Sequence, residues 1–245
     1  MDLDRNRRAR RFFDGIAQRY DLLSELLSFF QFGRWRRFLV SRLSVRSGDT
    51  VLDLCTGTAT VADRMARTLD VKVVGVDLSA EMLQGARRRI SSRRLDGRVS
   101  LLMGRAENLA FTDGCFDAVC FTYLLRYVDD PAATLEEIVR VLKPGGCLIS
   151  LEFGMPTNVL ARGLWHAYAK AALPMATRFL SPGWRDLGTF LGPNIEAFCR
   201  SYPLEHLLQM WWDLDISDVR IKRLSLGGGV VMWGTKSAEG TQRKV

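Results

Sequence analysis

A glycine-containing turn and the carboxylate that follows it are the residues of this sequence best placed to bind a ligand. The turn Thr56-Gly57-Thr58 comes after one apolar run, and Asp77 ends a second apolar run about 20 residues later. Small residues let a ligand approach the backbone closely, and a carboxylate at that spacing can accept the hydroxyls of a ribose. The pattern predicts a nucleotide-like ligand, with an ordinary strand-to-helix turn as the alternative.

A strand–helix–strand unit must hold these residues. We predict strands over residues 51–54 and 71–76, with a helix over about 60–69 between them. The alternation continues, with strands predicted at 99–103, 116–121 and 148–153 and helices at 81–91 and 131–141. Repeated units of this kind form a parallel sheet with helices on both faces, and such sheets bind ligands at the carboxyl ends of their strands.

Two helical segments flank this core. Residues 1–48 carry apolar residues at helical spacing and are predicted to pack across a sheet edge or over its mouth. Residues 156–202 are an aromatic-rich helical insertion. We expect this insertion to be interrupted at Gly183, Gly188, Gly192 and Pro193.

The end of the chain is predicted to close the sheet. After a helix at 204–212, the apolar runs 219–224 and 230–233 are close enough to form an antiparallel hairpin at the sheet edge. We therefore predict a single domain over 1–245. Its parts are 1–48, the core at 49–155, the insertion at 156–202, the last helix and hairpin at 203–236, and a frayed tail at 237–245.

Composition limits the classes of protein and partner. No run approaches the 18 or so apolar residues of a membrane span, and the arginine-rich start lacks the apolar core of a secretory signal. Five cysteines without a C-x-x-C pair favour reduced thiols and a cytoplasmic protein. The net charge is +8, but no nucleic-acid-binding module appears, so no nucleic-acid partner is predicted. A solvated basic surface and peripheral contact with an anionic membrane both stay open.

Other chemistries lack their motifs. There is no lysine-bearing phosphate loop, which disfavours nucleotide hydrolysis, and the full G-x-G-x-x-G fingerprint is missing. No histidine, cysteine and carboxylate cluster has ligand spacing, so no metal is predicted. We expect packing roles for the two histidines, His166 and His206, with a general-base role for His166 as the alternative.

Several segments are similar, in order and spacing, to the motifs of class I S-adenosylmethionine-dependent methyltransferases: DTVLDLCTGTA, VVGVDLSAEML, GRAENLAF, CFDAVCFTYLLRYVDDP and VLKPGGCLISLEF. More narrowly, FFDGIAQRYDLLSELLS, LLRYV, LEFGMP and GGGVVMWGTK resemble the ubiquinone/menaquinone biosynthesis C-methyltransferases. The resemblance covers residues 12–155 and 203–236. It implies a Rossmann-like α/β fold with a seven-stranded sheet, mostly parallel with an antiparallel last hairpin, N-terminal helices and a helical insertion after the fifth strand.

The resemblance also implies a site for S-adenosylmethionine. Asp77 would accept the ribose hydroxyls, and Asp53 would orient the amino-acid end of the cofactor. Thr58 would contact the cofactor where Gly57 permits close approach. Leu78 and Met82 would flank the adenine, and Arg105 and Ala106 would lie at its edge. Thr122 is the implied residue at the end of the fourth strand.

Arg126, in the run LLRYV, is the residue that the resemblance implies for catalysis. Arginine stays protonated in proteins, so we expect it to stabilise a phenolate or orient a water rather than act as the base. An ion pair with Asp129 or Asp130 is the structural alternative. The proton acceptor is left open.

We therefore predict an enzyme that methylates a ring carbon of a demethylated, demethylmenaquinol-like quinol in quinone biosynthesis. Ala59 and Arg105 depart from the family pattern, and Tyr127 stands where the family has asparagine. These departures keep two alternatives open. One is methyl transfer to another hydrophobic small molecule or lipid amine, and the other is a non-catalytic binding protein of the same fold. The oligomeric state is left open.

Overall fold

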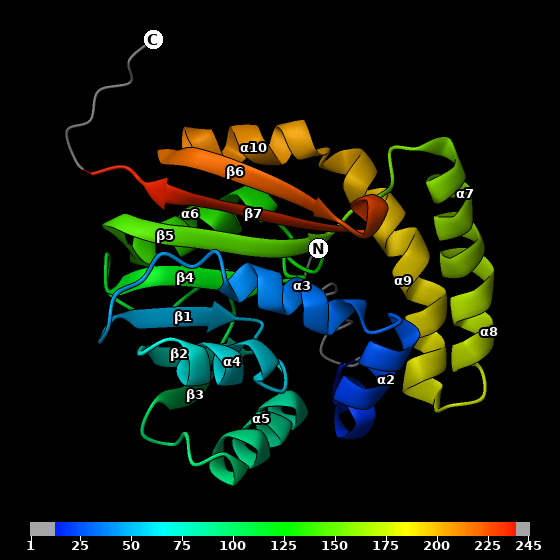
Figure 1. Cartoon of the computed structure of the whole chain (residues 1–245), viewed down its shortest axis with the longest axis horizontal. Coiled ribbons are helices and arrows are strands. Elements are labelled where there is room, and N and C mark those ends of the chain that lie inside the picture. Colours follow the sequence, from blue (N-terminus) through cyan, green and yellow to red (C-terminus); the bar gives the residue numbers. More distant parts are fainter. Residues whose placement is uncertain (1–12, 239–245) are drawn as a thin grey trace.

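The computed structural model describes residues 13–238, which form one seven-stranded sheet with flanking helices (Figure 1). The strands are β1 (Thr50–Leu54), β2 (Lys72–Asp77), β3 (Val99–Met103), β4 (Phe116–Thr122), β5 (Leu142–Phe153), β6 (Ile216–Leu224) and β7 (Gly229–Lys236). Their order is β3-β2-β1-β4-β5-β7-β6. The first five strands pair in parallel, whereas β7 is antiparallel to both β5 and β6. The predicted parallel sheet with an antiparallel edge hairpin is confirmed.

Helices cover both faces of the sheet, as predicted. They are α3 (Gln31–Val40), α4 (Thr60–Thr68), α5 (Ala80–Ser92), α6 (Pro131–Val141) and α10 (Leu204–Asp213). One apolar cluster joins α3, α4 and α5 to strand residues such as Val51, and the other joins α6 and α10 to strand residues such as Leu52. Successive strand residues point to opposite faces. A strand buried on both faces therefore has to be apolar throughout, which is why these runs could be recognised in the sequence.

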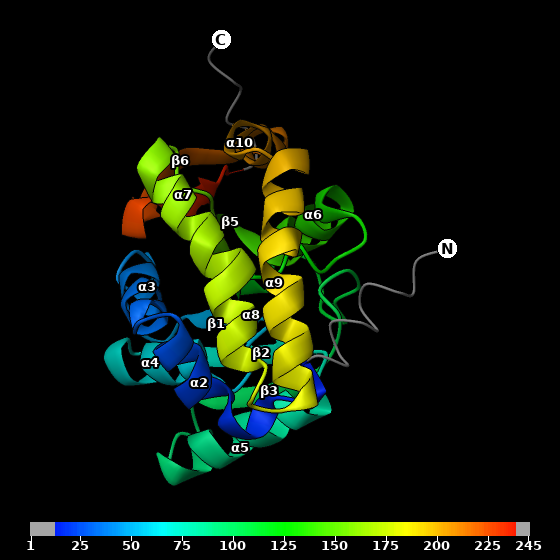
Figure 2. The same cartoon turned by 90° about the vertical axis from the view of Figure 1, so that its right-hand side faces the viewer.

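A helical hairpin stands beyond the carboxyl ends of the parallel strands (Figures 1 and 2). It comprises α7 (Val159–Ala167), a π-helical turn η2 (Tyr168–Ala172), α8 (Leu173–Thr177) and α9 (Pro182–Ser201). The predicted interruption at Gly183, Gly188, Gly192 and Pro193 is wrong, because α9 continues through all four. A Cβ on Gly188 would lie 1.9 Å from the Thr177 hydroxyl, and one on Gly192 would lie 2.7 Å from the Ala169 carbonyl oxygen. These glycines permit close packing of α9 against its neighbours instead of breaking the helix.

The N-terminal segment packs over the mouth of the sheet, as predicted. A short turn η1 (Ala17–Arg19) leads into α2 (Tyr20–Leu27), which lies in front of the strand ends (Figure 2) and packs against α9 through the stacked rings of Tyr20 and Trp184. Helix α3 then crosses the face of the sheet. The arginines between positions 5 and 11 and residues 239–245 of the predicted tail lie outside the described residues.

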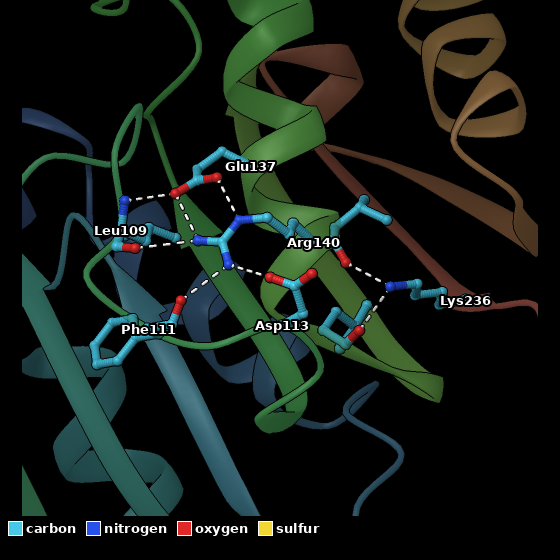
Figure 3. Close-up of polar contacts among 8 residues, drawn as sticks. Leu109, Phe111, Asp113, Glu137, Arg140 and Lys236 are labelled. Carbon is cyan, nitrogen blue, oxygen red and sulfur yellow. Dashed lines mark hydrogen bonds and ion pairs between the residues drawn. The ribbon is translucent and has the colours of Figure 1, made fainter.

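Arg140, near the end of α6, fixes the loop between β3 and β4 (Figure 3). Its guanidinium donates to the carbonyl oxygens of Leu109 (3.1 Å) and Phe111 (2.9 Å) and to the carboxylate of Asp113 (2.6 Å). Glu137, one turn earlier, accepts from both Arg140 and the Leu109 amide. The loop that carries the residues implied at the adenine edge is thus anchored to a core helix.

The structure bears on membrane spans, metal ligands and disulfides. Within residues 13–238, no helix combines the length and apolar character needed to cross a bilayer. That part of the chain also holds no group of three or more histidine, cysteine or carboxylate side chains arranged to ligate a metal ion. All five cysteines are free thiols.

Candidate active site

The carboxyl ends of β1, β2 and β4 border a cavity of about 100 Å³, here called the strand-end cavity. Parallel sheets bind ligands at this edge. Most of the predicted cofactor-binding residues line it together: Gly57, Thr58, Asp77, Leu78, Met82, Arg105, Ala106 and Thr122. Asp53 and Arg126 are the two predicted site residues that do not line it.

Asp77 ends β2 and turns its carboxylate toward the turn after β1. One oxygen accepts from the Gly57 amide (2.8 Å) and the other accepts from the Ser79 amide (2.9 Å). Burial raises the pKa of this carboxyl above its ordinary value, although the two backbone hydrogen bonds favour the ionised form. Each carboxylate oxygen has two lone pairs, so the group can still accept donors from a ligand.

The turn between β1 and α4 is strained. Cys55, Gly57 and Ala59 have φ values of 54°, 56° and 59°, which lie in the left-handed region. Glycine adopts this region freely, but the other two residues do so at a cost in free energy. Cys55 lines the cavity, and Ala59 lies between Thr58 and Thr60, which line it too. Residues in such conformations concentrate at ligand sites.

Thr58 connects this turn to the N-terminal segment. Its hydroxyl donates to Asp21 of α2 (2.6 Å), and Asp21 also pairs with Arg89 of α5. The hydroxyl of Ser79, the residue that caps α5, donates to Asp14. These bonds fasten the N-terminal segment to the wall of the strand-end cavity, so the Thr58 hydroxyl is engaged by α2.

Asp53 lies beneath the turn and is fully buried. The Thr56 hydroxyl donates to its carboxylate (2.6 Å). Burial raises the pKa of Asp53 to about 7, although the hydrogen bond from Thr56 acts in the opposite direction. Thr56 lines the strand-end cavity, so Asp53 supports the cavity through its neighbour.

The other end of the strand-end cavity combines apolar and charged groups. Leu78 and the buried Met82 contribute apolar surface. Arg105 pairs with Glu107 (3.3 Å), which also lines the cavity. Arg105, which departs from the family pattern, therefore has the Glu107 carboxylate beside it. The sequence analysis did not identify this hydrogen-bond acceptor.

A second cavity, of about 270 Å³, lies between α2, α3 and the helical hairpin and is here called the helical cavity. Four aromatic residues line both cavities and form a shared wall: Phe13, Tyr20, Tyr123 and Tyr127. The Phe13 ring contacts the rings of Tyr20 (6.2 Å between centroids) and Tyr127 (5.5 Å). Away from this wall, residues of the hairpin such as Trp165 and Leu173 make the helical cavity largely apolar.

Arg126 lines the helical cavity and is buried. Its Nη1 lies 3.5 Å from Oε2 of Glu152 on β5, and its Nη2 donates to the Tyr127 hydroxyl (3.3 Å). The guanidinium carbon lies 4.6 Å from the ring centroids of both Tyr127 and Phe153. Desolvation lowers the pKa of Arg126, but Tyr127 and Glu152 outweigh it and the net shift is upward. Its ion-pair partner is thus Glu152, whereas Asp130, one of the two acids expected, caps α6.

Two buried donors in this region have no partner. They are the Nε atom of Arg126 and the hydroxyl of Tyr123, which make no hydrogen bond within residues 13–238. Tyr123 also has a left-handed φ of 57°, which is costly for a bulky residue. Burial raises the pKa of Tyr20 to about 12 and that of Tyr123 above its ordinary value, so both hydroxyls stay protonated. Buried unpaired donors beside an apolar cavity indicate a ligand with a polar group at one end.

Some of these residues had a signal in the sequence and others had none. Glu152 is the one charged residue in the largely apolar run CLISLEF, which could have marked it as a site residue. Nothing local distinguishes Asp21 or Tyr123, because their roles depend on partners that are distant in the sequence. His166 packs beside Trp165 (5.2 Å between ring centroids) and lines neither cavity.

Comparisons with known proteins agree with this geometry. The chain matches the model of the ubiE/COQ5 methyltransferase family over residues 1–236. It is 34% identical over 225 residues to the "ubiquinone/menaquinone biosynthesis C-methyltransferase UbiE" of Desulfotalea psychrophila, covering 91% of this chain and 88% of that protein. It is 38% identical over 220 residues to the "demethylmenaquinone methyltransferase" of Paenarthrobacter aurescens, with coverages of 89% and 81%. An S-adenosyl-L-methionine-dependent methyltransferase structure from Methanococcus maripaludis shares the fold, with a TM-score of 0.63, 19% identity and coverages of 92% and 94%.

Proposed function

The chain belongs to the ubiE/COQ5 methyltransferase family and is a methyltransferase, and we propose that it methylates a ring carbon of a demethylated quinol. One observation carries the choice of acceptor. Arg126 and Tyr123 line a cavity that is otherwise largely apolar and shares a wall with the strand-end cavity, and the Arg126 Nε and the Tyr123 hydroxyl are buried without hydrogen-bond partners among the described residues. A quinol with a hydrocarbon tail has the matching distribution of groups, namely ring hydroxyls at one end and an apolar tail at the other.

S-adenosylmethionine fits the strand-end cavity by the chemistry of its lining. Asp77 would accept the ribose hydroxyls, and Gly57 leaves room for the ligand beside the turn. Leu78 and Met82 would flank the adenine, and Glu107 offers an acceptor where Arg105 offers only donors. The cofactor supplies an electrophilic methyl group attached to a positively charged sulfur.

Ala106 and Thr122 would complete the binding of the adenine and of the methionine end of the cofactor. We assign Thr58 and Asp53 supporting roles. The hydroxyl of Thr58 holds α2 in place through Asp21, and Asp53 holds Thr56. Both therefore keep the turn in its ligand-binding shape.

The residues of the chain prepare the acceptor. A ring carbon becomes nucleophilic when the adjacent hydroxyl loses its proton, which leaves negative charge on oxygen. The fixed positive charge of Arg126 and the Tyr123 hydroxyl stabilise that charge where little water competes. Glu152 holds the guanidinium in place, and the aromatic wall brings the two ligands together while excluding water.

The same lining favours a phenolic acceptor over a lipid amine. No carboxylate lines the helical cavity within residues 13–238, and the charge that Arg126 brings to it is positive. A protonated amine would be repelled by this charge, whereas a phenolate would be attracted.

The test is incubation of the protein with methyl-labelled S-adenosylmethionine and a demethylmenaquinol analogue with a short tail. We expect a ring-methylated product by mass spectrometry, with the oxidised quinone as an unreactive control. Binding of S-adenosylhomocysteine is measured in parallel by calorimetry. Saturable binding without methylation of any quinol would refute the acceptor. Absence of binding would instead favour a non-catalytic protein of this fold.

A further inference from the structure

The outer surface around the helical cavity is unusually apolar. On the α7–α8 side, the exposed fractions of Leu160, Leu164, Met175 and Phe179 range from 64% to 82%. On the α2 side, four further apolar residues are exposed: Leu22, Leu26, Phe29 and Phe30. We call these eight residues the apolar rim. Helices α2, α7 and α8 all appear on the face that Figure 2 shows.

The rim adjoins the helical cavity. Phe29 belongs to the rim, yet it also lines that cavity and contacts the ring of Tyr168 (5.8 Å between centroids). Tyr168 lines the cavity too, and its hydroxyl donates to the carbonyl oxygen of Leu27. The α2 side and the hairpin side of the rim therefore meet at the cavity.

Backbone strain holds two aromatic side chains in this exposed position. Phe29 and Phe30 have φ values of 51° and 60°, and their exposed fractions are 71% and 61%. A left-handed conformation is costly for a bulky residue, and two in succession are rare. Relaxation of this turn would relieve the strain, so its persistence indicates a use for exposed aromatic groups.

Charge beside the hairpin part of the rim is mainly positive. From residue 153 to residue 185 the sequence contains no aspartate or glutamate, but it contains exposed Arg162, Arg178 and Arg185. Lys170 is also exposed, but it pairs with Glu196 of α9 (2.8 Å). The acids of α2 are engaged away from the rim: Asp21 binds Thr58 and Arg89, and Glu25 binds the Gly33 amide and Arg36. An apolar surface bordered by cations complements an anionic lipid bilayer, which offers hydrocarbon behind a layer of negative headgroups.

We propose that the apolar rim docks on an anionic bilayer and opens the helical cavity toward it. Rim side chains enter the boundary between headgroups and acyl chains, and Arg162, Arg178 and Arg185 contact the headgroups. The inference extends the proposed function, because a long-tailed acceptor would then enter without its tail crossing water. Docking itself requires no methyl transfer and can be measured separately.

The experiment is co-sedimentation of the full chain with vesicles of phosphatidylcholine containing phosphatidylglycerol. The triple variant Leu160→Ser/Leu164→Ser/Phe179→Ser removes rim residues that line neither cavity. Its partitioning is expected to fall about tenfold or more. A matched control, Leu102→Ser/Met103→Ser/Trp212→Ser, removes three exposed apolar side chains from β3 and α10 and should leave partitioning within about twofold of the parent. Vesicles without anionic lipid should bind the parent about tenfold more weakly.

Two readouts separate this proposal from failed folding and from failure of the proposed function. S-adenosylhomocysteine affinity reports folding, and methylation of a short-tailed soluble quinol without vesicles reports the chemistry. Both should be equal in the parent and the rim variant. Docking without methylation would reject the quinol acceptor but keep the rim. The rim proposal is overturned if the parent does not bind vesicles, or if the rim variant binds as the parent does. It is also overturned if the rim instead joins two copies of the chain, seen by light scattering as a dimer that the variant dissociates.

Discussion

The two cavities meet at one wall but are built in different ways. Residues 54–128 form most of the strand-end cavity, with Phe13, Tyr20 and Arg36 added from the N-terminal segment. Asp77 orders it through the amides of Gly57 and Ser79. The helical cavity is formed by side chains from segments more than a hundred residues apart, and its polar group, Arg126, is held by side chains alone. Backbone-held sites tolerate sequence change better than sites made of packed side chains. We infer that cofactor binding is the shared property of the fold and that acceptor choice is the variable one.

The largest expected effect is on chemistry at the helical cavity. Replacing Arg126 by methionine removes the charge that stabilises the phenolate and is predicted to lower kcat by about 10²- to 10³-fold. S-adenosylhomocysteine affinity should stay within about twofold, because Arg126 does not line the strand-end cavity. Steady-state kinetics and calorimetry measure the two quantities. An equal loss in both would mean that the cavities are not separable.

The reciprocal change is Asp77→Ala. It removes the ribose acceptor and the anchor for the Gly57 and Ser79 amides, so cofactor affinity should fall by about 100-fold. Calorimetry with S-adenosylhomocysteine measures it, with Asp213→Ala as the control, because Asp213 is an exposed carboxylate of α10 that lines neither cavity. Unchanged affinity in Asp77→Ala would refute the ribose assignment.

The buried ion pair between Arg126 and Glu152 should contribute to the stability of the helical cavity. Glu152→Gln leaves the Arg126 guanidinium buried without its counter-charge, and the free energy of unfolding should fall by about 3 kcal/mol. The double variant Arg126→Met/Glu152→Gln should recover much of that loss, because no charge is then stranded. Urea unfolding of the parent, both single variants and the double variant gives the coupling energy. A coupling near zero would show that the pair is not formed.

The packing of the hairpin should affect only the helical cavity. In Gly192→Ala, the new methyl group would meet the Ala169 carbonyl oxygen at 2.7 Å and force α9 away from its neighbour. We expect a loss of about 1–3 kcal/mol in stability and a higher KM for the quinol, with cofactor affinity unchanged. Gly163→Ala is the matched control, because a Cβ there meets nothing within 4 Å.

The smallest effect concerns the support beneath the strand-end turn. The pKa of Asp53 is raised to about 7 in the folded protein from an ordinary 3.8. Its contribution to stability is therefore fully present below about pH 4 and is lost as pH rises through about 7. Asp53→Asn mimics the protonated form, so its stability relative to the parent should increase between pH 5 and pH 8. Thermal unfolding at both values measures this, and a pH-independent difference would contradict the raised pKa.

The sequence predicted the fold and the strand-end cavity better than the helical cavity, for a physical reason. Doubly buried strands must be apolar, and a small-residue turn followed at this spacing by Asp77 is typical of a nucleotide-binding unit, so both leave local signals. The Glu152 partner of Arg126 and the aromatic wall depend on contacts between distant segments. Glycines in α9 suggested breaks because composition alone cannot distinguish a break from a close helix contact.

The shared wall has a consequence for the order of events during turnover. Phe13, Tyr20, Tyr123 and Tyr127 face both cavities, so a ligand in either one restricts rings that the other ligand must also contact. We therefore expect the first ligand to bear the ordering entropy and the second to bind more tightly. By thermodynamic linkage the gain is the same whichever ligand arrives first. The wall therefore couples the two affinities and favours the ternary complex over either half-filled state, without requiring the backbone to move.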